Sequence, residues 1–500
     1  MQKNVREATE AEQQMGFTEA LRLYPAAVAW SVGLSTAVIM EGYSLMLLSN
    51  LYAQPQFNRR YGDLQSDGSY VISAPWRSGL SNGALCGELL GLFLTGVAQD
   101  RYGYRKTIFA ALFMVTGFLF ILFFAQNLPM LLVGEILCGI PWGTFQTITT
   151  AYASEVCPVA LRAYLTTYVN LCWVIGQLIV SGVLRGVLDR DDQWAYRIPF
   201  AIQWIWPVPL MVMCVYAPES PWWSVRKGRF EEAKRNLARL TQGSEDAIDA
   251  TLALMQHTNE LEELSTAGTS YRDCFRGINL RRTEIVCLTW LIQAICGAKF
   301  MGYSTVFYVA AGVPQSWSFN LTLIQYAIGF VRTVLSWFLM AHVGRRTLYL
   351  YGTLLLCCLL VIIGSVSLAP RSNHVAHWAD AILLTVFIFC YDLTVGPVCY
   401  SLISELSSTR LRAKTVVLAR NLYNVAGIVN WGAKSIFFWG GICFCCSLWI
   451  FFRLPEPKGR TYGELDILFA QGVSARKFSC TMVDITDSTL SREDKLTAKQ

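Results

Sequence analysis

Charged residues and histidine are both scarce in this chain. Asp, Glu, Lys and Arg make up 15% of its 500 residues, and histidine occurs four times, at widely separated positions. Histidines this scattered lack the close ligand spacing of a metal site, and no basic cluster suggests nucleic-acid binding. The sequence also shows no nucleophile paired with a base. We therefore expect neither an enzyme nor a cofactor, and no nucleic-acid partner.

Long apolar stretches dominate what is present. Hydrophobic residues make up 54% of the chain, which has 16 Trp and 22 Tyr and lies outside the soluble globular norm. A bilayer crossing needs about 20 apolar residues of helix. We predict an all-α membrane protein with 12 transmembrane helices in two six-helix halves. The predicted crossings are residues 26–48, 79–99, 108–126, 130–153, 163–185, 198–216, 284–310, 321–341, 348–368, 379–403, 414–430 and 433–452.

The polar intervals suggest a division into five parts. These are an N-terminal tail (1–25), a first six-helix bundle (26–216), a linker with amphipathic helices (217–283), a second six-helix bundle (284–452) and a C-terminal tail (453–500). Lys and Arg favour the even-numbered gaps, which predicts that these gaps, the linker and both tails are cytosolic. The opposite loops contain none of the 16 cysteines, so we expect no disulfide framework there.

A short pattern occurs twice, half a chain length apart. Ser154, Glu155, Leu161, Arg162 and Ala163 follow the fourth predicted crossing, and the same residue types follow the tenth, at Ser404, Glu405, Leu411, Arg412 and Ala413. Internal repeats of this kind are the architecture of secondary transporters. The repeat therefore predicts a transporter built from two similar halves.

Four motifs in the predicted cytosolic segments resemble one family. They are Gly96–Lys106, Pro218–Trp223, Gly344–Arg346 and Pro455–Arg460, and they resemble the sugar porter branch of the major facilitator superfamily. The stretches 135–177 and 293–312 are similar to fungal maltose and α-glucoside permeases. The resemblance implies the major facilitator fold, transport by alternating access and a functional monomer in the lipid bilayer.

Acids and bases at the cytosolic helix ends are candidate gating residues. Glu155 with Arg162, and Glu405 with Arg412, are spaced to bridge adjacent helices across a short loop, while Arg105 and Arg345 come from neighbouring gaps. The resemblance implies that such pairs stabilise the outward-facing state. The alternative is that they only anchor helix ends as positive-inside charges. The full candidate set is Asp100, Arg105, Glu155, Arg162, Arg345, Glu405 and Arg412.

Few ionisable residues fall inside the predicted crossings, where each costs about 2.5 to 3.5 kcal/mol on insertion scales. They are Glu41, Glu88, Glu135, Lys299, Arg332, Asp392 and Arg420. By resemblance to the α-glucoside proton symporters, Glu41, Glu88 and Arg420 are the proton-coupling candidates, whereas Glu135 and Asp392 lie near helix ends and are equally compatible with an interfacial place. Ser44 stands where the family has an Asp, and Lys299 and Arg332 add positive charge to the second half. These departures favour a lower proton affinity.

A sugar site needs amides that hydrogen-bond hydroxyls and aromatic faces that stack on the ring. Gln177, Gln293, Tyr400 and Asn424 match sugar-contacting positions of the family's motifs, and Tyr303, Tyr308 and Trp142 are further candidates. For each residue alone, interhelical packing or hydrogen bonding remains an alternative.

Together these features predict a plasma-membrane transporter that imports an α-glucoside such as maltose with a proton. An uncoupled sugar facilitator is the first alternative, favoured by Ser44. A transporter-like sugar sensor, or an inactive shortened form, are the others. The last follows from the predicted eleventh crossing, 414–430, which has only 17 residues before the connection Asn430–Trp431–Gly432.

Overall fold

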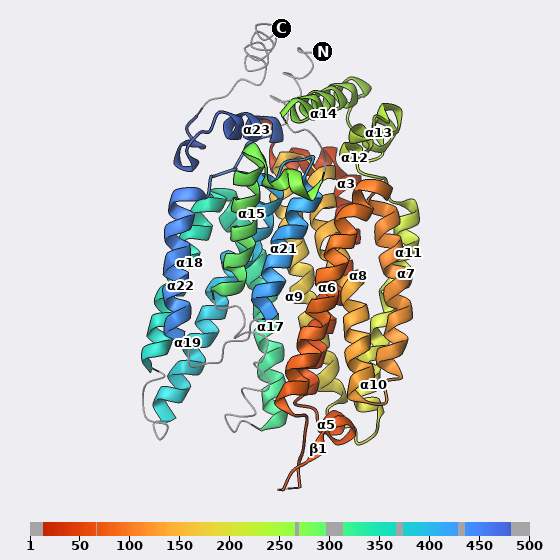
Figure 1. Cartoon of the computed structure of the whole chain (residues 1–500), viewed down its shortest axis with the longest axis vertical. Helices are drawn as coiled ribbons and strands as arrows, with labels where there is room; N and C mark the ends of the chain where they lie inside the picture. The colour runs from red at the N-terminus through yellow and green to blue at the C-terminus, as the bar shows by residue number, and fades with distance from the viewer. Residues whose placement is uncertain are drawn as a thin grey trace.

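The computed structural model describes residues 14–66, 68–265, 270–296, 314–366, 374–428 and 436–481. Long helices run side by side between two ends of the molecule, which confirms the predicted all-α membrane fold (Figure 1). Nine stretches of helix in this described part are long and apolar enough to cross a membrane. They are α3–α4 (Pro25–Ser35 and Ala37–Leu51), α6 (Ala74–Tyr102), α7 (Tyr104–Phe123), α8 (Leu128–Val156), α9 (Val159–Val187), α10–α11 (Trp194–Ile202 and Pro207–Tyr216), α17 (Gln315–His342), α18 (Arg345–Val366) and α19–α20 (His374–Leu393 and Val395–Leu406). The other predicted crossings fall on α15 (Gly277–Ile295), α21 (Arg412–Ile428) and α22 (Ile436–Arg453).

Short elements cover the two ends. One end, which we call the linker face, carries α12 (Pro221–Arg226), α13 (Phe230–Ala238), α14 (Glu245–Ser265) and α23 (Tyr462–Ala470) (Figure 1). The opposite end, the hairpin face, carries α5 (Pro55–Tyr61) and the antiparallel pair of β1 (Asp63–Leu64) and β2 (Tyr70–Val71). The remaining short helices are α2 (Phe17–Leu23), η1 (Gln203–Ile205), η2 (Tyr271–Phe275) and η5 (Ala475–Lys477).

Glycines allow the first-half helices to pack with their backbones in close contact. A Cβ added at Gly87 of α6 would lie 1.9 Å from the Ile136 carbonyl oxygen of α8, and one added at Gly42 of α4 would lie 2.3 Å from the Trp173 carbonyl oxygen of α9. Small residues permit this approach between helices that gain little from hydrophobic burial in lipid. The close approach of α6 to α8 and of α4 to α9 leaves little space around the polar side chains between these helices.

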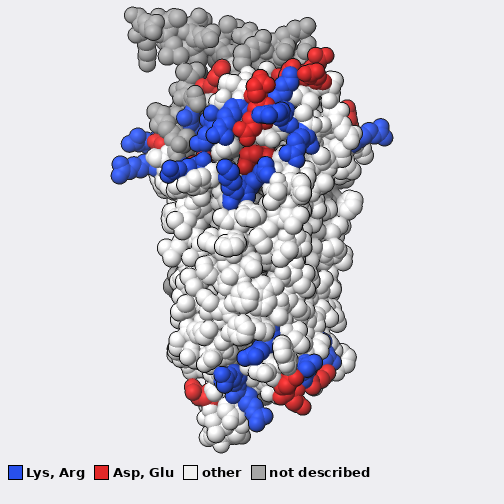
Figure 2. All heavy atoms as spheres, turned by 90° about the vertical axis from the view of Figure 1, so that its right-hand side faces the viewer, with Lys and Arg blue, Asp and Glu red and all other residues white. Residues whose placement is uncertain are grey.

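Charge is distributed as a membrane requires. On the side of the molecule shown in Figure 2, charged side chains gather at the two ends and leave a broad uncharged band between them. Exposed apolar side chains such as Leu94, Phe113 and Val212 belong to the long helices of this band. A bilayer covers such a band without burying charge.

Candidate functional site

Glu41 of α4, Glu88 of α6 and Arg420 of α21 meet inside the helix bundle. Nη2 of Arg420 lies 3.4 Å from Oε1 of Glu41 and 3.8 Å from Oε2 of Glu88. All three side chains are buried. These are the three residues that the sequence predicted for proton coupling, and the structure brings them together from both halves. We call this set the buried acid pair with its arginine.

Two amides complete the surroundings of the acids. Nε2 of Gln146 donates to Oε1 of Glu41 at 2.8 Å, and Nδ2 of Asn424 donates to Oε2 of Glu88 at 2.8 Å. In the described part of the chain, the second carboxyl oxygen of each acid is buried without a hydrogen-bond partner. Each acid therefore has one carboxyl oxygen that makes no hydrogen bond within the described residues.

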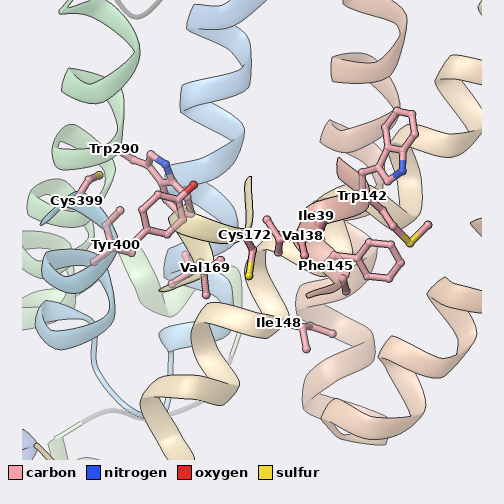
Figure 3. Close-up of a cluster of buried hydrophobic side chains, with 14 of the residues drawn as sticks. Val38, Ile39, Trp142, Phe145, Ile148, Val169, Cys172, Trp290, Cys399 and Tyr400 are labelled. Carbon is pink, nitrogen blue, oxygen red and sulfur yellow. The ribbon is translucent and has the colours of Figure 1, made fainter. Parts of the chain in front are cut away.

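Aromatic rings extend from this cluster toward the boundary between the halves. The Arg420 guanidinium lies 4.2 Å from the ring centre of Tyr423 and 5.5 Å from that of Trp290. The Trp290 and Tyr400 rings meet edge to face at 5.7 Å. Figure 3 shows these two rings beside Val169 of α9, among buried side chains from both halves. The structure therefore places polar side chains and aromatic rings, the group types that recognise sugars, close to one another.

The other sugar-contact candidates have different surroundings. Nε2 of Gln293 in α15 donates to the Gly396 carbonyl at 3.1 Å, and the backbone carbonyl of Gln293 accepts from the Tyr391 hydroxyl at 3.3 Å. Gln177 is buried on α9, and among the described residues no hydrogen bond joins its side chain to the cluster. Tyr303, Tyr308 and Lys299 lie outside the described residues. Trp142 is buried among apolar side chains, which agrees with its packing alternative.

The departures from the family pattern are accommodated locally. Arg332 of α17 pairs with Asp392 of α19 at 3.6 Å, and both are buried. The positive charge that Arg332 adds to the second half is therefore paired with an acid. Ser44 donates to Oε1 of Gln203 in η1, so a neutral hydrogen bond occupies the position of the missing acid. Glu135 and Asp392 are also buried, so neither carboxyl extends into solvent.

Ion pairs close the linker face between the halves. Glu155 at the end of α8 pairs with Arg226 of α12 at 3.0 Å and with Arg412 of α21 at 3.5 Å, and it also accepts from Ser220. Asp100 of α6 pairs with Lys414 of α21. In the second half, Glu405 pairs with Arg345 at 3.6 Å. The sequence paired Arg412 with Glu405, but Arg412 reaches across to the first half instead.

Tyr462 of α23 lies between the two repeated arginines. The guanidinium carbons of Arg162 and Arg412 are 3.7 Å and 4.2 Å from its ring centre, and its hydroxyl donates to the Ser154 carbonyl at 3.1 Å. Cations over an aromatic face are attracted to it, more so when buried. No sequence pattern described above includes Tyr462. Its position directly after the Pro455–Arg460 motif is the sequence feature that could have identified it as a candidate.

Two glutamates cap equivalent helices in the two halves. Glu219 accepts from the backbone N–H groups of Tyr104 and Arg105, at 2.9 and 3.2 Å, and Glu456 accepts from those of Arg345 and Arg346, at 2.9 and 3.0 Å. Burial raises the pKa of both glutamates, although these donors oppose the shift. Carboxylates at helix N-termini are stabilising.

Glycine precedes each of these capped helices. A Cβ at Gly103 would lie 2.5 Å from the Glu219 carboxylate, and one at Gly344 would lie 2.1 Å from the Glu456 carboxylate. Arg105 donates to the Cys214 carbonyl at 3.1 Å and to the Val215 carbonyl, and Arg346 donates to the Phe451 carbonyl at 2.7 Å. The counterpart of Arg105 is therefore Arg346.

Comparison with known proteins gives consistent matches. A family described as "Sugar (and other) transporter" matches residues 30–469. The Alpha-glucosides permease MPH3 of Saccharomyces cerevisiae is 46% identical over 506 residues, which cover 96% of this chain and 84% of the permease. The Maltose permease MAL31 of the same yeast is 44% identical over 504 residues, covering 96% and 82%. Among solved structures, the proton:xylose symporter XylE bound to 6-bromo-6-deoxy-D-glucose superposes with a TM-score of 0.72 at 20% identity, covering 93% of this chain and 99% of that one.

Proposed function

The chain belongs to the sugar transporter family of the major facilitator superfamily, and from that premise we propose that it imports an α-glucoside such as maltose, with a proton, by alternating access. It is a membrane transporter and not an enzyme. The observation that carries the proton part is the buried acid pair with its arginine, Glu41, Glu88 and Arg420.

Charge counting supports proton binding at this cluster. Two ionised carboxylates and one guanidinium leave one uncompensated negative charge in a site removed from water. Buried charge of this kind is relieved when an acid takes up a proton. A cluster that gains a proton on the outside and loses it to the cytosol therefore couples transport to the proton gradient.

The neighbouring side chains support a sugar as the substrate. Gln293 and Asn424 each have a buried amide oxygen without a partner in the described residues, and the Trp290–Tyr400 pair supplies aromatic faces. Sugar hydroxyls both donate and accept hydrogen bonds, and the apolar faces of the sugar ring pack on aromatic rings. An α-glucoside is the substrate named for the yeast relatives at 46% identity.

The linker-face contacts support an outward-facing state. Glu155–Arg412 and Asp100–Lys414 join the two halves, and Tyr462 lies over the same junction. Inward opening must separate these pairs, as in other rocking transporters. We place the linker face and both tails in the cytosol, and the monomeric protein in the plasma membrane, because Lys and Arg gather at this end.

The decisive experiment measures uptake of labelled maltose and glucose in a transport-deficient host, with and without a protonophore. We expect accumulation of maltose above the external concentration and its loss with the protonophore. Glu41→Gln is the matched variant, which should abolish accumulation and retain exchange. Uptake that is indifferent to the protonophore would refute proton symport.

An uncoupled sugar facilitator is the second candidate. The hydrogen bond between Ser44 and Gln203 favours a facilitator, because a neutral pair stands where the family has an acid. A facilitator equilibrates maltose without accumulating it, and Glu41→Gln would then change the rate only modestly. The same uptake assay therefore separates the two candidates.

A further inference from the structure

Asn424 is the residue at which the proton cluster and the sugar-type groups join. Its Nδ2 donates to Oε2 of Glu88 at 2.8 Å, and its Oδ1 is buried without a hydrogen-bond partner among the described residues. The NH2 group of the Asn424 amide therefore bonds to Glu88, whereas its carbonyl oxygen makes no hydrogen bond in the described residues. Asn421, one turn away on α21, has no side-chain partner in the described residues at either end of its amide.

The protonation state of Glu88 dictates which end of this amide faces it. An ionised carboxylate only accepts hydrogen bonds, so it requires the amide N–H. A carboxyl protonated on Oε2, the oxygen that faces Asn424, donates from that O–H group, and the amide oxygen is then the better partner. A rotation of about 180° about the last side-chain bond exchanges the two ends, and this torsion has a broad, roughly two-fold preference.

We propose that Asn424 couples sugar binding to proton binding by reversing its amide when Glu88 is protonated. The inference rests on the proposed function as a proton-coupled sugar transporter. With Glu88 ionised, Asn424 and Gln293 both present amide oxygens, which only accept hydrogen bonds from the sugar. After reversal Asn424 presents N–H, and the two amides offer one donor and one acceptor. Sugar hydroxyls need both, so the protonated transporter binds sugar more tightly.

The charges around Asn424 determine how this switch responds to pH. Glu88 of α6 and Glu41 of α4 face it from the first half, and Arg420 and Tyr423 lie on its own helix. From α20, Tyr400 and Cys399 are the titratable groups near Arg420, and α15 contributes the uncharged Trp290. From α8, Gln146 is uncharged and bonds to Glu41. Arg420 remains charged in both states, so the proton has only the two acids to occupy.

The test uses the purified full-length transporter reconstituted into lipid vesicles. The pH dependence of its maltose affinity and its proton uptake are measured in the same vesicles. In the parent protein we expect affinity to rise about tenfold from pH 7.5 to pH 5, within the usual range of coupling between two sites. Asn424→Ala should flatten this dependence to less than about twofold and lower the proton-to-sugar ratio. Asn421→Ala, the matched control, should keep the parent's dependence.

Asn424→Gln restores an amide and should recover part of the pH dependence. A merely structural Asn424 would weaken maltose binding equally at both pH values, and that parallel loss would overturn the inference. If the parent protein itself shows no proton uptake with maltose, the proposed symport fails. If the parent is coupled and Asn424→Ala remains equally coupled, only the amide switch fails.

Discussion

The membrane interior and the linker face both hold ion pairs, but they are built differently. In the interior, two acids share one cation, Arg420, and no other cation lies within ion-pair distance of them in the described part of the chain. On the linker face, Glu155 has two arginines and a serine hydroxyl, and a second pair, Asp100–Lys414, joins the same halves. Loss of Arg420 therefore leaves the interior acids without any cation in that part of the chain. On the linker face, loss of one charged residue leaves other ion pairs in place.

The largest effect is expected where nothing substitutes for the missing charge. Arg420→Gln leaves Glu41 and Glu88 buried without their cation, and breaking a buried pair costs about 3 to 5 kcal/mol. We predict a fall in initial maltose uptake of at least about 100-fold at equal surface expression. Arg420→Lys, the matched variant, should retain part of the activity. Uptake by Arg420→Gln within threefold of the parent would remove the contrast with the linker face.

An intermediate effect should separate the two repeated glutamates. Glu155 joins the halves through Arg412, whereas the ion pair and the hydrogen bond described for Glu405 are with Arg345 and Ser401 of its own half. Glu155→Gln should therefore favour inward opening by about five- to tenfold, and Glu405→Gln by less than about threefold. Labelling of a cysteine placed beneath the linker face measures this opening. Equal labelling of the two variants would show that the repeat acts symmetrically.

The smallest effect is expected at the exposed end of the inter-half contacts. The Asp100 side chain is 29% exposed, and pairs that reach solvent contribute about 0 to 1 kcal/mol. Asp100→Asn should change maltose uptake by less than about fivefold, and less still at high salt. A loss comparable to that of Arg420→Gln would mean that the linker face is not redundant.

Much of the fold was predictable because the length and apolar composition of membrane helices can be recognised in the sequence. The interior acids and Arg420 were also predictable, since charge inside a crossing is costly and conspicuous. Their amide partner Gln146 was not, because an amide in a crossing is common and its helix orientation cannot be obtained from one sequence. Asn424 was found only through family resemblance.

Partners across the two halves were the least predictable. Glu155 and Arg412 are 257 positions apart, and only the packing of α8 against α21 brings them together. Spacing within one loop instead suggested Arg412 with Glu405. The Arg332–Asp392 pair was not predicted for the same reason, because the sequence does not show that α17 and α19 bring these two residues together.

The ring of Tyr462 lies where side chains from both repeats and from α23 converge. A probe at this one position is therefore surrounded by both halves, and its environment changes whichever half moves. A fluorescent label on Tyr462→Cys, in a background without other accessible thiols, would act as an optical sensor of the transport cycle. Adding sugar and lowering the pH on the same side of the membrane should then shift this single signal in the same direction.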